Sequence, residues 1–290
     1  MPELPEVEIT ARVLDTALAG ARVAYARAPG INALRTFAPP LSALEGGLIA
    51  AVRRRGKHLI VEIDAGGEAS RRLALLIHLM SAGRLQLYDK PAGPRDRTSR
   101  LLVGLDDGRE LRLREFGSKQ AAWVKLLPAD ELEQDDALAT LGPEAWPDPG
   151  GPAELQELLD APRPLHALLR DQHVIAGVGR SWVDEILWRA KLSPYKRGAD
   201  LDTDEVQLLR DTMRETLGAA IAHYEQTVSL PIPDKLPMPL RIHRHEGEAC
   251  PRCGSTLQAV HFEDYVIAYC PTCQTEGRVL KDRRLSRLLR

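Results

Sequence analysis

Residues 1–8 read Met-Pro-Glu-Leu-Pro-Glu-Val-Glu. Removal of Met1 would leave Pro2 as the amino terminus, with a secondary amine that no other position of a chain provides. An α-amino group titrates near ~8, below lysine, so more of it is neutral and nucleophilic at pH 7. Attack of this amine on a carbonyl carbon gives a cationic iminium, which can accept electrons in an elimination. The carboxylates of Glu3 and Glu6 stand beside it as candidate proton carriers. The alternative interpretation is a solvated entry to a helix.

The octet runs directly into a predicted helix. Apolar residues recur at helical spacing over residues 5–19, so one face of this helix is expected to be buried. Pro2 would then lie just before the helix start, where the macrodipole disfavours the ammonium form and lowers the amine's pKa. Glu3 and Glu6 act in the opposite direction.

The pattern changes after residue 21 to short alternating runs with glycine punctuation. Residues 59–63, 73–79, 101–103 and 123–126 are predicted strands, and Asp107-Gly108 is a hairpin turn signal. An antiparallel β-sandwich of about eight strands is therefore expected over residues 21–127, behind the first helix.

An acidic segment rich in Pro and Gly follows, and helical periodicity dominates afterwards. Helices are predicted at 152–160, 163–171, 180–191 and 203–224, the last with Asp202 or Thr203 as N-cap. Gly177 and Gly179 precede the third of these helices. A Gly-x-Gly is usually only a tight turn, but at a helix start the backbone N–H groups suit a phosphate.

The four cysteines form two Cys-x2-Cys pairs. Cys250 and Cys253 are separated by sixteen residues from Cys270 and Cys273. This spacing is typical of a structural four-cysteine zinc site, whereas two disulfides are disfavoured in a reducing compartment. Closed thiolate coordination contributes on the order of 10 kcal/mol to the folding of such a segment.

Composition limits the function classes. The chain has 290 residues, 44% of them hydrophobic, which is enough for two globular domains. Its longest apolar run, residues 73–79, is far shorter than the ~20 residues that span a bilayer, and no basic, apolar signal region opens the chain. We therefore expect a cytoplasmic protein without membrane contact. The net charge of −2 disfavours a nucleic-acid partner. Phosphate binding depends, however, on local clusters of Lys and Arg, and residues 53–57 and 278–290 form two such basic clusters.

The octet, the Gly-x-Gly turn and the cysteine pairs agree in order and spacing with one family. The chain resembles the formamidopyrimidine-DNA glycosylase / endonuclease VIII family over nearly its whole length up to Cys273. The resemblance implies an α+β multidomain protein, with an amino-terminal helix and antiparallel β-sandwich followed by a helix–two-turn–helix bundle with a zinc-finger hairpin. The expected segments are a catalytic domain 1–127, a linker 128–152, a DNA-binding domain 153–240, a zinc finger 241–275 and a basic tail 276–290.

The resemblance also implies roles for individual residues. Pro2 would be the Schiff-base nucleophile, Glu3 its acid/base partner, and Lys57 the hairpin lysine that assists elimination. The zinc ligands would be Cys250, Cys253, Cys270 and Cys273. The residues expected to contact DNA are Glu6, His78, Arg114, Phe116, Gly177, Gly179 and Arg180.

The register of the residues that fill the hole left by an everted base is ambiguous. The family's methionine aligns with Ser81, one place after Met80, which on a strand would lie on the opposite face. Arg114 and Phe116 match the other two fillers by motif, but counting without gaps places them at residues 117 and 119. A histidine in an apolar strand, such as His78, is as often a core residue as a phosphate contact.

Three positions depart from the family pattern. Arg180 replaces an asparagine after the Gly-x-Gly turn, and Tyr265 replaces the finger arginine that grips phosphate. Either the finger only braces the domain, or Arg252 or the basic tail takes over. The segment 225–240 is shorter than the loop that covers an oxidised purine in purine-specific members.

The resemblance implies a base-excision-repair DNA glycosylase with abasic-site lyase activity on damaged double-stranded DNA. We expect a nucleoid-associated monomer with one structural zinc ion and no small-molecule cofactor. Oxidised purines, such as 8-oxoguanine and formamidopyrimidine, are the first substrate choice. The alternatives are oxidised pyrimidines, abasic sites only, or a non-catalytic zinc-containing binder of damaged DNA.

Overall fold

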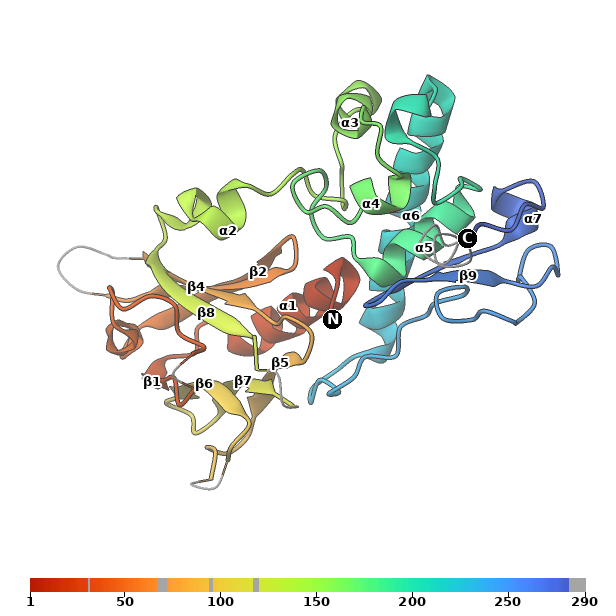
Figure 1. The fold of residues 1–290 in the computed structure, drawn as a ribbon. Helices are drawn as coiled ribbons and strands as arrows, with labels where there is room; N and C mark the ends of the chain where they lie inside the picture. Colours follow the sequence, from red (N-terminus) through yellow and green to blue (C-terminus); the bar gives the residue numbers. More distant parts are fainter. Residues whose placement is uncertain (31, 67–71, 94–95, 117–119, 282–290) are drawn as a thin grey trace. The chain divides into compact units, whose positions relative to one another are not determined.

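The computed structural model describes residues 1–30, 32–66, 72–93, 96–116 and 120–281 (Figure 1). The chain forms two compact units. The first comprises residues 1–140 and 221–237, and the second comprises residues 141–220 and 238–290. Helices and antiparallel strands occur in both, which confirms the predicted α+β multidomain class.

The described residues of the first unit form eight antiparallel strands in two four-stranded sheets, with orders β2-β3-β4-β8 and β1-β6-β7-β5. The strands are β1 Val23–Arg27, β2 Leu48–Arg55, β3 His58–Asp64, β4 Arg72–His78, β5 Gly83–Tyr88, β6 Ser99–Leu105, β7 Glu110–Glu115 and β8 Trp123–Pro128. A 3-10 turn, η1 (Leu41–Leu44), precedes β2. The predicted sandwich of about eight strands is confirmed.

Helix α1 (Leu4–Leu18) is part of the same core as both sheets. Its apolar face, which includes Val7, Leu14 and Leu18, is fully buried. Polar bonds fix its register on β2, because Asp15 Oδ1 accepts the Val52 N–H at 2.7 Å. The helix that carries the amino terminus is thus anchored by apolar burial and by a side chain bonded to a strand.

Two tight turns position Lys57 and Met80. The β2–β3 hairpin turns through Gly56 and Lys57, with Gly56 at φ +55°, so Lys57 lies at the hairpin tip and not inside a strand. After β4, the chain turns at Met80, a non-glycine residue with φ +50°. The expectation that Met80 and Ser81 alternate across a strand is therefore wrong, because the strand ends at His78 and both residues belong to the turn.

The second unit holds the helical segment and the cysteine-bearing hairpin. Its elements are α3 Pro152–Leu159, α4 Leu165–Leu168, α5 Arg180–Arg189, η3 Gly198–Asp200, most of α6 Thr203–Thr227, β9 Gln258–His261, β10 Val266–Tyr269 and α7 Pro271–Gln274. Helix α6 starts with a reciprocal cap, in which Asp202 Oδ1 accepts the Glu205 N–H at 2.8 Å and Glu205 Oε2 accepts the Asp202 N–H at 3.1 Å. Asp202 is therefore the N-cap, and the residues of α6 from Ile221 onward belong to the first unit.

The segment between β8 and α3 has short helical turns, η2 (Leu132–Gln134) and α2 (Asp136–Ala139). The division between the units falls within it, after Thr140. None of the helices in the described part of the chain combines the length and apolar character of a membrane span.

Candidate active site and nucleic-acid interface

The amino terminus lies at the start of α1, where two glutamates cap the helix. Glu3 is the N-cap, and Glu6 Oε2 accepts the Glu3 N–H at 2.9 Å. Both carboxylates are buried, with 2% and 4% of their surface exposed. Buried carboxylates are costly unless bonded, so this capping box fixes the residue that follows Pro2. In the described chain Met1 is present, and the Pro2 nitrogen is an amide.

Tyr224, near the end of α6, holds the second glutamate from the other side. Its O–H donates to Glu6 Oε1 at 2.8 Å, and its side chain is fully buried in the core of the first unit. Burial and then the charge of Glu6 raise the pKa of Tyr224, so the phenol stays a donor. The Glu6 carboxylate is thereby oriented by bonds at both of its oxygens.

Lys57 is buried at the tip of the β2–β3 hairpin, with 7% of its surface exposed. Arg54, three residues before Lys57 on β2, anchors this hairpin to α1 by an ion pair of 2.8 Å with Glu8. Burial alone would raise the pKa of Glu8, but its bonds and charge interactions with Arg54 and then Arg12 together outweigh burial and lower that pKa. The hairpin that carries Lys57 and the helix that follows Pro2 are therefore fastened to each other within one unit.

His78 lies in an aromatic cluster at the end of β4. Its ring stacks on Trp123 at 5.6 Å and 10° and faces His58 at 4.7 Å. Burial, and then repulsion from His58 and Lys57, lowers the pKa of His78 to about 3, and burial lowers that of His58 to about 4. His78 Nδ1 accepts the Met80 N–H at 3.0 Å. His78 is hence a neutral imidazole near pH 7, which can offer only its Nε2–H to a phosphate.

Arg114 and Phe116 lie together at the end of β7. The Arg114 guanidinium carbon is 4.6 Å from the centre of the Phe116 ring, and the side chain donates to Tyr88 Oη at 2.6 Å and to Thr98 Oγ1 at 3.0 Å. Phe116 is a large apolar residue that is 37% exposed. The rival positions 117 and 119 lie outside the described residues.

The turn before α5 requires a glycine at its first position, because Gly177 has φ +101°, a backbone conformation that other residues rarely adopt. The Gly177 N–H is already bonded to Gln172 Oε1 at 3.0 Å, and Gln172 Nε2 donates to the Val178 carbonyl at 2.8 Å. The expectation that this amide is free for a phosphate is therefore wrong. Gly179 is the N-cap of α5, and Arg180 is its first residue.

The four cysteines converge as the spacing predicts. Their sulfur atoms all lie within 4.8 Å of one another, and Cys253 Sγ is 3.5 Å from Cys270 Sγ. Tetrahedral Zn–S bonds of about 2.3 Å place sulfurs about 3.8 Å apart, so the four thiols fit such an ion. Further support comes from donors to sulfur: Trp188 Nε1 lies 3.4 Å from Cys250 Sγ, and the Cys273 N–H donates to Cys270 Sγ.

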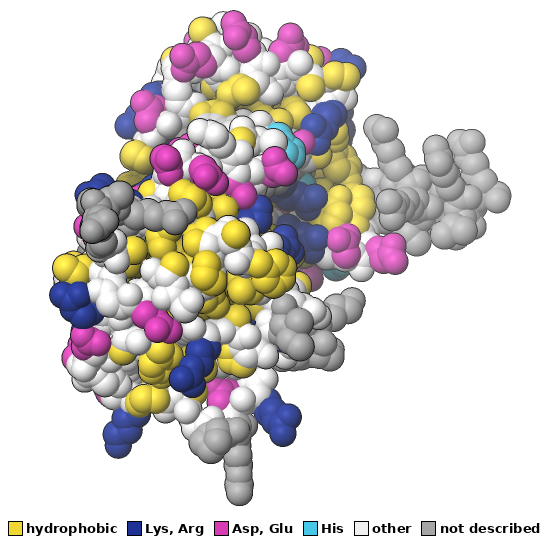
Figure 2. All heavy atoms as spheres, turned by 90° about the vertical axis from the view of Figure 1, so that its left-hand side faces the viewer, with side chains coloured by type: hydrophobic (Ala, Val, Ile, Leu, Met, Phe, Trp, Pro, Cys, Tyr) yellow, Lys and Arg dark blue, Asp and Glu magenta, His cyan; other side chains and the backbone are white. Residues whose placement is uncertain are grey.

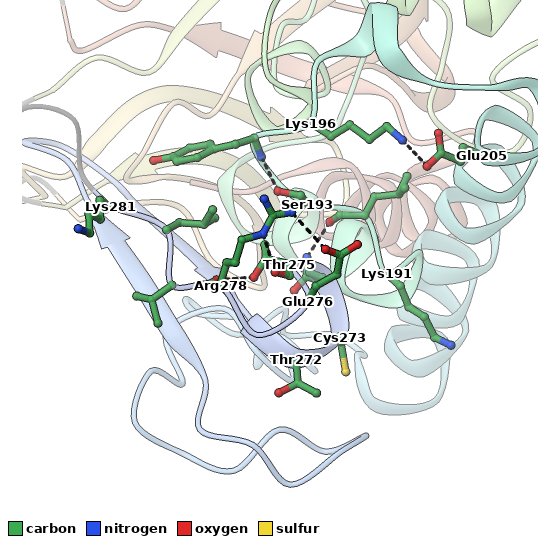
Figure 3. Close-up of a pocket in the computed structure, with 15 residues that line it drawn as sticks. Lys191, Ser193, Lys196, Glu205, Thr272, Cys273, Thr275, Glu276, Arg278 and Lys281 are labelled. Carbon is green, nitrogen blue, oxygen red and sulfur yellow. Dashed lines mark hydrogen bonds and ion pairs between the residues drawn. The ribbon is translucent and has the colours of Figure 1, made fainter.

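A depression beside the second cysteine pair is lined by the segment after α5, by α7 and by residues 276–281 (Figure 3). The first residues of the basic tail are held by β10, because the Leu280 N–H donates to Tyr269 Oη at 2.7 Å, and Arg278 pairs within the tail with Glu276 at 3.4 Å. Arg252 is also engaged, since it donates to the Trp188 carbonyl at 2.9 Å at the end of α5. The arginines of the tail beyond residue 281 lie outside the described residues.

Surface charge is mixed on the face drawn in Figure 2, where Lys and Arg side chains are interspersed with Asp and Glu and with hydrophobic groups. This agrees with the net charge of −2. Binding to a polyanion therefore depends on particular local cations, not on a general positive field.

Comparison with known proteins identifies the family. A family model described as the formamidopyrimidine-DNA glycosylase N-terminal domain matches residues 1–118, and one described as the H2TH domain of the same enzyme matches residues 141–231. The formamidopyrimidine-DNA glycosylase of Roseiflexus sp. (strain RS-1) is 32% identical over 283 residues, covering 94% of this chain and 100% of the relative. The chain belongs to the formamidopyrimidine-DNA glycosylase family.

Solved structures of this glycosylase family agree with the assignment. A complex of Lactococcus lactis Fpg with DNA containing an abasic site has a TM-score of 0.82 at 26% identity, covering 94% of this chain and 99% of that chain. A complex of the same protein with DNA containing N7-benzyl-Fapy-dG also has a TM-score of 0.82, at 27% identity. The predicted family membership is confirmed.

Within the first unit, the predicted residues lie at the start of α1, on the hairpin bonded to it, at the end of β4, and at the end of β7, where Arg114 contacts Phe116. The structure also adds residues that sequence reasoning missed. Pro2, Glu3 and Glu6 share the α1 terminus, and Lys57 lies on the hairpin bonded to α1. Tyr224 was missed because it follows Glu6 by 218 residues. The neighbours of His78, namely His58 and Trp123, were missed as well, although strand pairing of the apolar runs could have suggested them.

Proposed function

We propose that this member of the glycosylase family removes a damaged base and then cuts the strand, with the amine of Pro2 as nucleophile. Family membership makes it a DNA glycosylase of base-excision repair. The observation that carries the nucleophile assignment is the buried cap of α1, in which the Glu6 carboxylate accepts the Glu3 N–H and so fixes the position of the residue just before the helix. The proposal requires removal of Met1, because an amide nitrogen is not nucleophilic.

In the proposed reaction the Pro2 nitrogen attacks C1′ of the damaged nucleotide, and the bond from C1′ to the base breaks. The departing base takes the bonding electrons and the proton that the attacking amine loses. Glu3 delivers a proton to the ring oxygen, so the sugar opens to a cationic iminium. Loss of a C2′ proton then supplies the electrons that break the C3′–O bond, and the 3′ phosphate leaves. Lys57 assists this elimination as a proton carrier. Water hydrolyses the iminium to the sugar aldehyde and restores the amine.

Oxidised purines and abasic sites are the proposed substrates. The Lactococcus lactis Fpg complexes contain abasic-site DNA and N7-benzyl-Fapy-dG DNA, and this chain matches that protein over 94% of its length. Oxidised pyrimidines are the second candidate, because the segment after α6 is short and held on β5. Gln86 Nε2 donates to the Ile232 carbonyl at 2.8 Å and to Asp234 Oδ1 at 2.9 Å.

We assign the remaining predicted contacts by their geometry. His78 would donate Nε2–H to a phosphate as a neutral imidazole, since its Nδ1 already accepts. Phe116, partly exposed and stacked by Arg114, is the proposed filler of the everted-base hole. Flipping a base out of the duplex costs a few kcal/mol, and this cost is smaller for a damaged base. An aromatic side chain replaces part of the lost stacking.

We further propose one structural zinc ion on the four cysteines. The mutual distances within 4.8 Å and the N–H donors to sulfur support this assignment. Four thiolates close the coordination sphere, so the ion stabilises residues 241–275 and takes no part in the reaction.

With DNA as its substrate, we expect the protein at the cytoplasmic nucleoid, which a fluorescent fusion counterstained for DNA would test.

A cleavage panel tests the function. Duplexes with 8-oxoguanine, formamidopyrimidine, thymine glycol or an abasic site are incubated with the protein and with its Pro2→Gly variant. We expect base release and strand cutting on the purine lesions, strand cutting alone on the abasic site, and loss of both activities in the variant. Binding without cutting on every duplex would instead identify a non-catalytic binder of damaged DNA. Cutting of the thymine glycol duplex alone would favour the pyrimidine alternative.

A further inference from the structure

The tip of the finger hairpin presents an aromatic ring to two arginines from the helical segment. Tyr265 lies between β9 and β10, and its ring centre is 4.2 Å from the guanidinium carbon of Arg170 and 5.4 Å from that of Arg180. Both distances are within the range of cation–π attraction. All three residues belong to the second unit.

The ring is itself held in a stack. Phe262 lies parallel to Tyr265 at 4.4 Å and 6°, and His166 lies nearly parallel at 6.0 Å and 10°. Burial lowers the pKa of His166 and outweighs the opposing effect of Asp184, 3.3 Å away. His166 is therefore a neutral member of the stack, and the positive charge on this ring comes from the two arginines.

No carboxylate among the described residues forms an ion pair with Arg170. Its Nη1 is buried and has no hydrogen-bond partner among the residues that the structure describes. A buried unsatisfied donor carries a desolvation cost, which an acceptor placed beside it would remove. Two guanidinium groups on one ring, one of them with an unused donor, form a site for an anion with several oxygens.

The acceptor now present is a carboxylate of the finger itself. Asp264 Oδ2 accepts from Arg180 Nη2 at 2.9 Å, and the Asp264 carbonyl accepts from Arg180 Nη1. The side chains of this pair are 45% and 68% exposed. Exposed ion pairs contribute little and exchange readily, so a phosphate oxygen can replace the Asp264 carboxylate.

We propose that Arg170 and Arg180, which both stack on the Tyr265 ring, bind a backbone phosphate of DNA. In the absence of DNA, the Asp264 carboxylate occupies the phosphate position on Arg180, and DNA displaces it. The inference rests on the proposed DNA-binding function and deepens it. It explains how one hairpin tip can carry two acidic residues, Glu263 and Asp264, and still face a polyanion. It also gives Tyr265 a role as a support for cations supplied by the helical segment.

The test compares two neighbouring carboxylates. Glu263 is exposed and makes no ion pair among the described residues, so Glu263→Gln removes the same charge as Asp264→Asn without freeing an arginine. Binding to a duplex with a tetrahydrofuran abasic analogue is measured by fluorescence anisotropy at several salt concentrations. We expect Asp264→Asn to tighten binding about two- to fivefold and Glu263→Gln to have a smaller effect.

Removal of the arginine should abolish this difference. Arg180→Gln is expected to weaken binding about tenfold and to reduce the slope of log K against log salt by about 0.9, as for one lost phosphate contact. In the Arg180→Gln background, Asp264→Asn should do no more than Glu263→Gln. Tyr265→Leu should weaken binding, whereas Tyr265→Phe, which keeps the ring, should preserve it. Equal circular dichroism and zinc content establish that each variant is folded.

Three results would overturn the inference: equal effects of the two carboxylate changes in both backgrounds, weaker binding by Asp264→Asn, or an unchanged salt slope in Arg180→Gln. The first would mean long-range repulsion alone, and the second would mean that Asp264 orients Arg180 for DNA. A wild-type protein that does not bind the duplex at all would contradict the proposed function instead, so the two failures are distinguishable.

Discussion

The hydrogen bond from Tyr224 to Glu6 gives a prediction of known size. Tyr224→Phe keeps the buried ring and removes one O–H bond of 2.8 Å to a buried carboxylate. Hydrogen bonds to charged groups contribute about 1.5–3 kcal/mol. If Glu6 positions the amino terminus through the Glu3 N–H, the full energy of the lost hydrogen bond is added to the activation free energy. The lyase rate then falls about 10- to 150-fold.

The assay is single-turnover cutting of an abasic duplex, with the protein in excess so that product release does not contribute. The chain offers a matched control within the same unit, because Tyr25 O–H donates to Glu110, another buried carboxylate, in the sheet β1-β6-β7-β5. Tyr25→Phe should reduce stability and leave the rate within about twofold. Equal rates for Tyr224→Phe and the wild type, or equal losses in both variants, would refute the positioning role of Glu6.

Three further predictions follow from the same geometry. Lys57→Ala should slow strand cutting by at least about tenfold while base release is less affected, since general acid–base assistance is typically worth 10²–10⁴-fold; separate quantification of free base and cut strand checks this. Chelation of zinc should expose residues 241–275 to proteolysis and abolish DNA binding, and a chelated protein that keeps both would contradict a structural ion. The folded-state pKa values of His78 and His58, about 3 and about 4, lie below the usual ~6.5. Between the folded-state and unfolded-state pKa values, the unfolded chain therefore binds more protons than the folded chain. The contribution of these histidines to the free energy of unfolding should be constant above about pH 6.5. Below that pH it should fall by at most about 1.4 kcal/mol per pH unit and per histidine. His78→Gln should flatten this slope in urea titrations at pH 7 and pH 5, and an unchanged slope would disprove neutral burial.

Local signals were sufficient for much of the fold. The helix after Pro2, the strands of the sandwich and the convergence of the cysteines all follow from periodicity or spacing, which depend on neighbouring residues. The cap at Glu3 and Glu6 is likewise a local pattern, because its two carboxylates are three residues apart.

Features that depend on tertiary packing could not be predicted. Tyr224 reaches Glu6 because α6 continues into the first unit, and no local pattern encodes that contact. The turn at Met80 requires a positive φ that a non-glycine residue rarely adopts, so an extended strand was the natural expectation. Arg180 and Tyr265, which both differ from the family pattern, lie far apart in the sequence, and only the structure shows that their side chains are in contact.

The central claim is that the ring nitrogen of Pro2 forms the covalent link to DNA. Its most direct test is to reduce the protein with borohydride on an abasic duplex, digest the adduct and locate the modified residue by mass spectrometry. We predict a deoxyribose remnant on an amino-terminal peptide that begins at Pro2, without Met1. An adduct on Lys57, or no adduct on a protein that still cuts the duplex, would contradict the account.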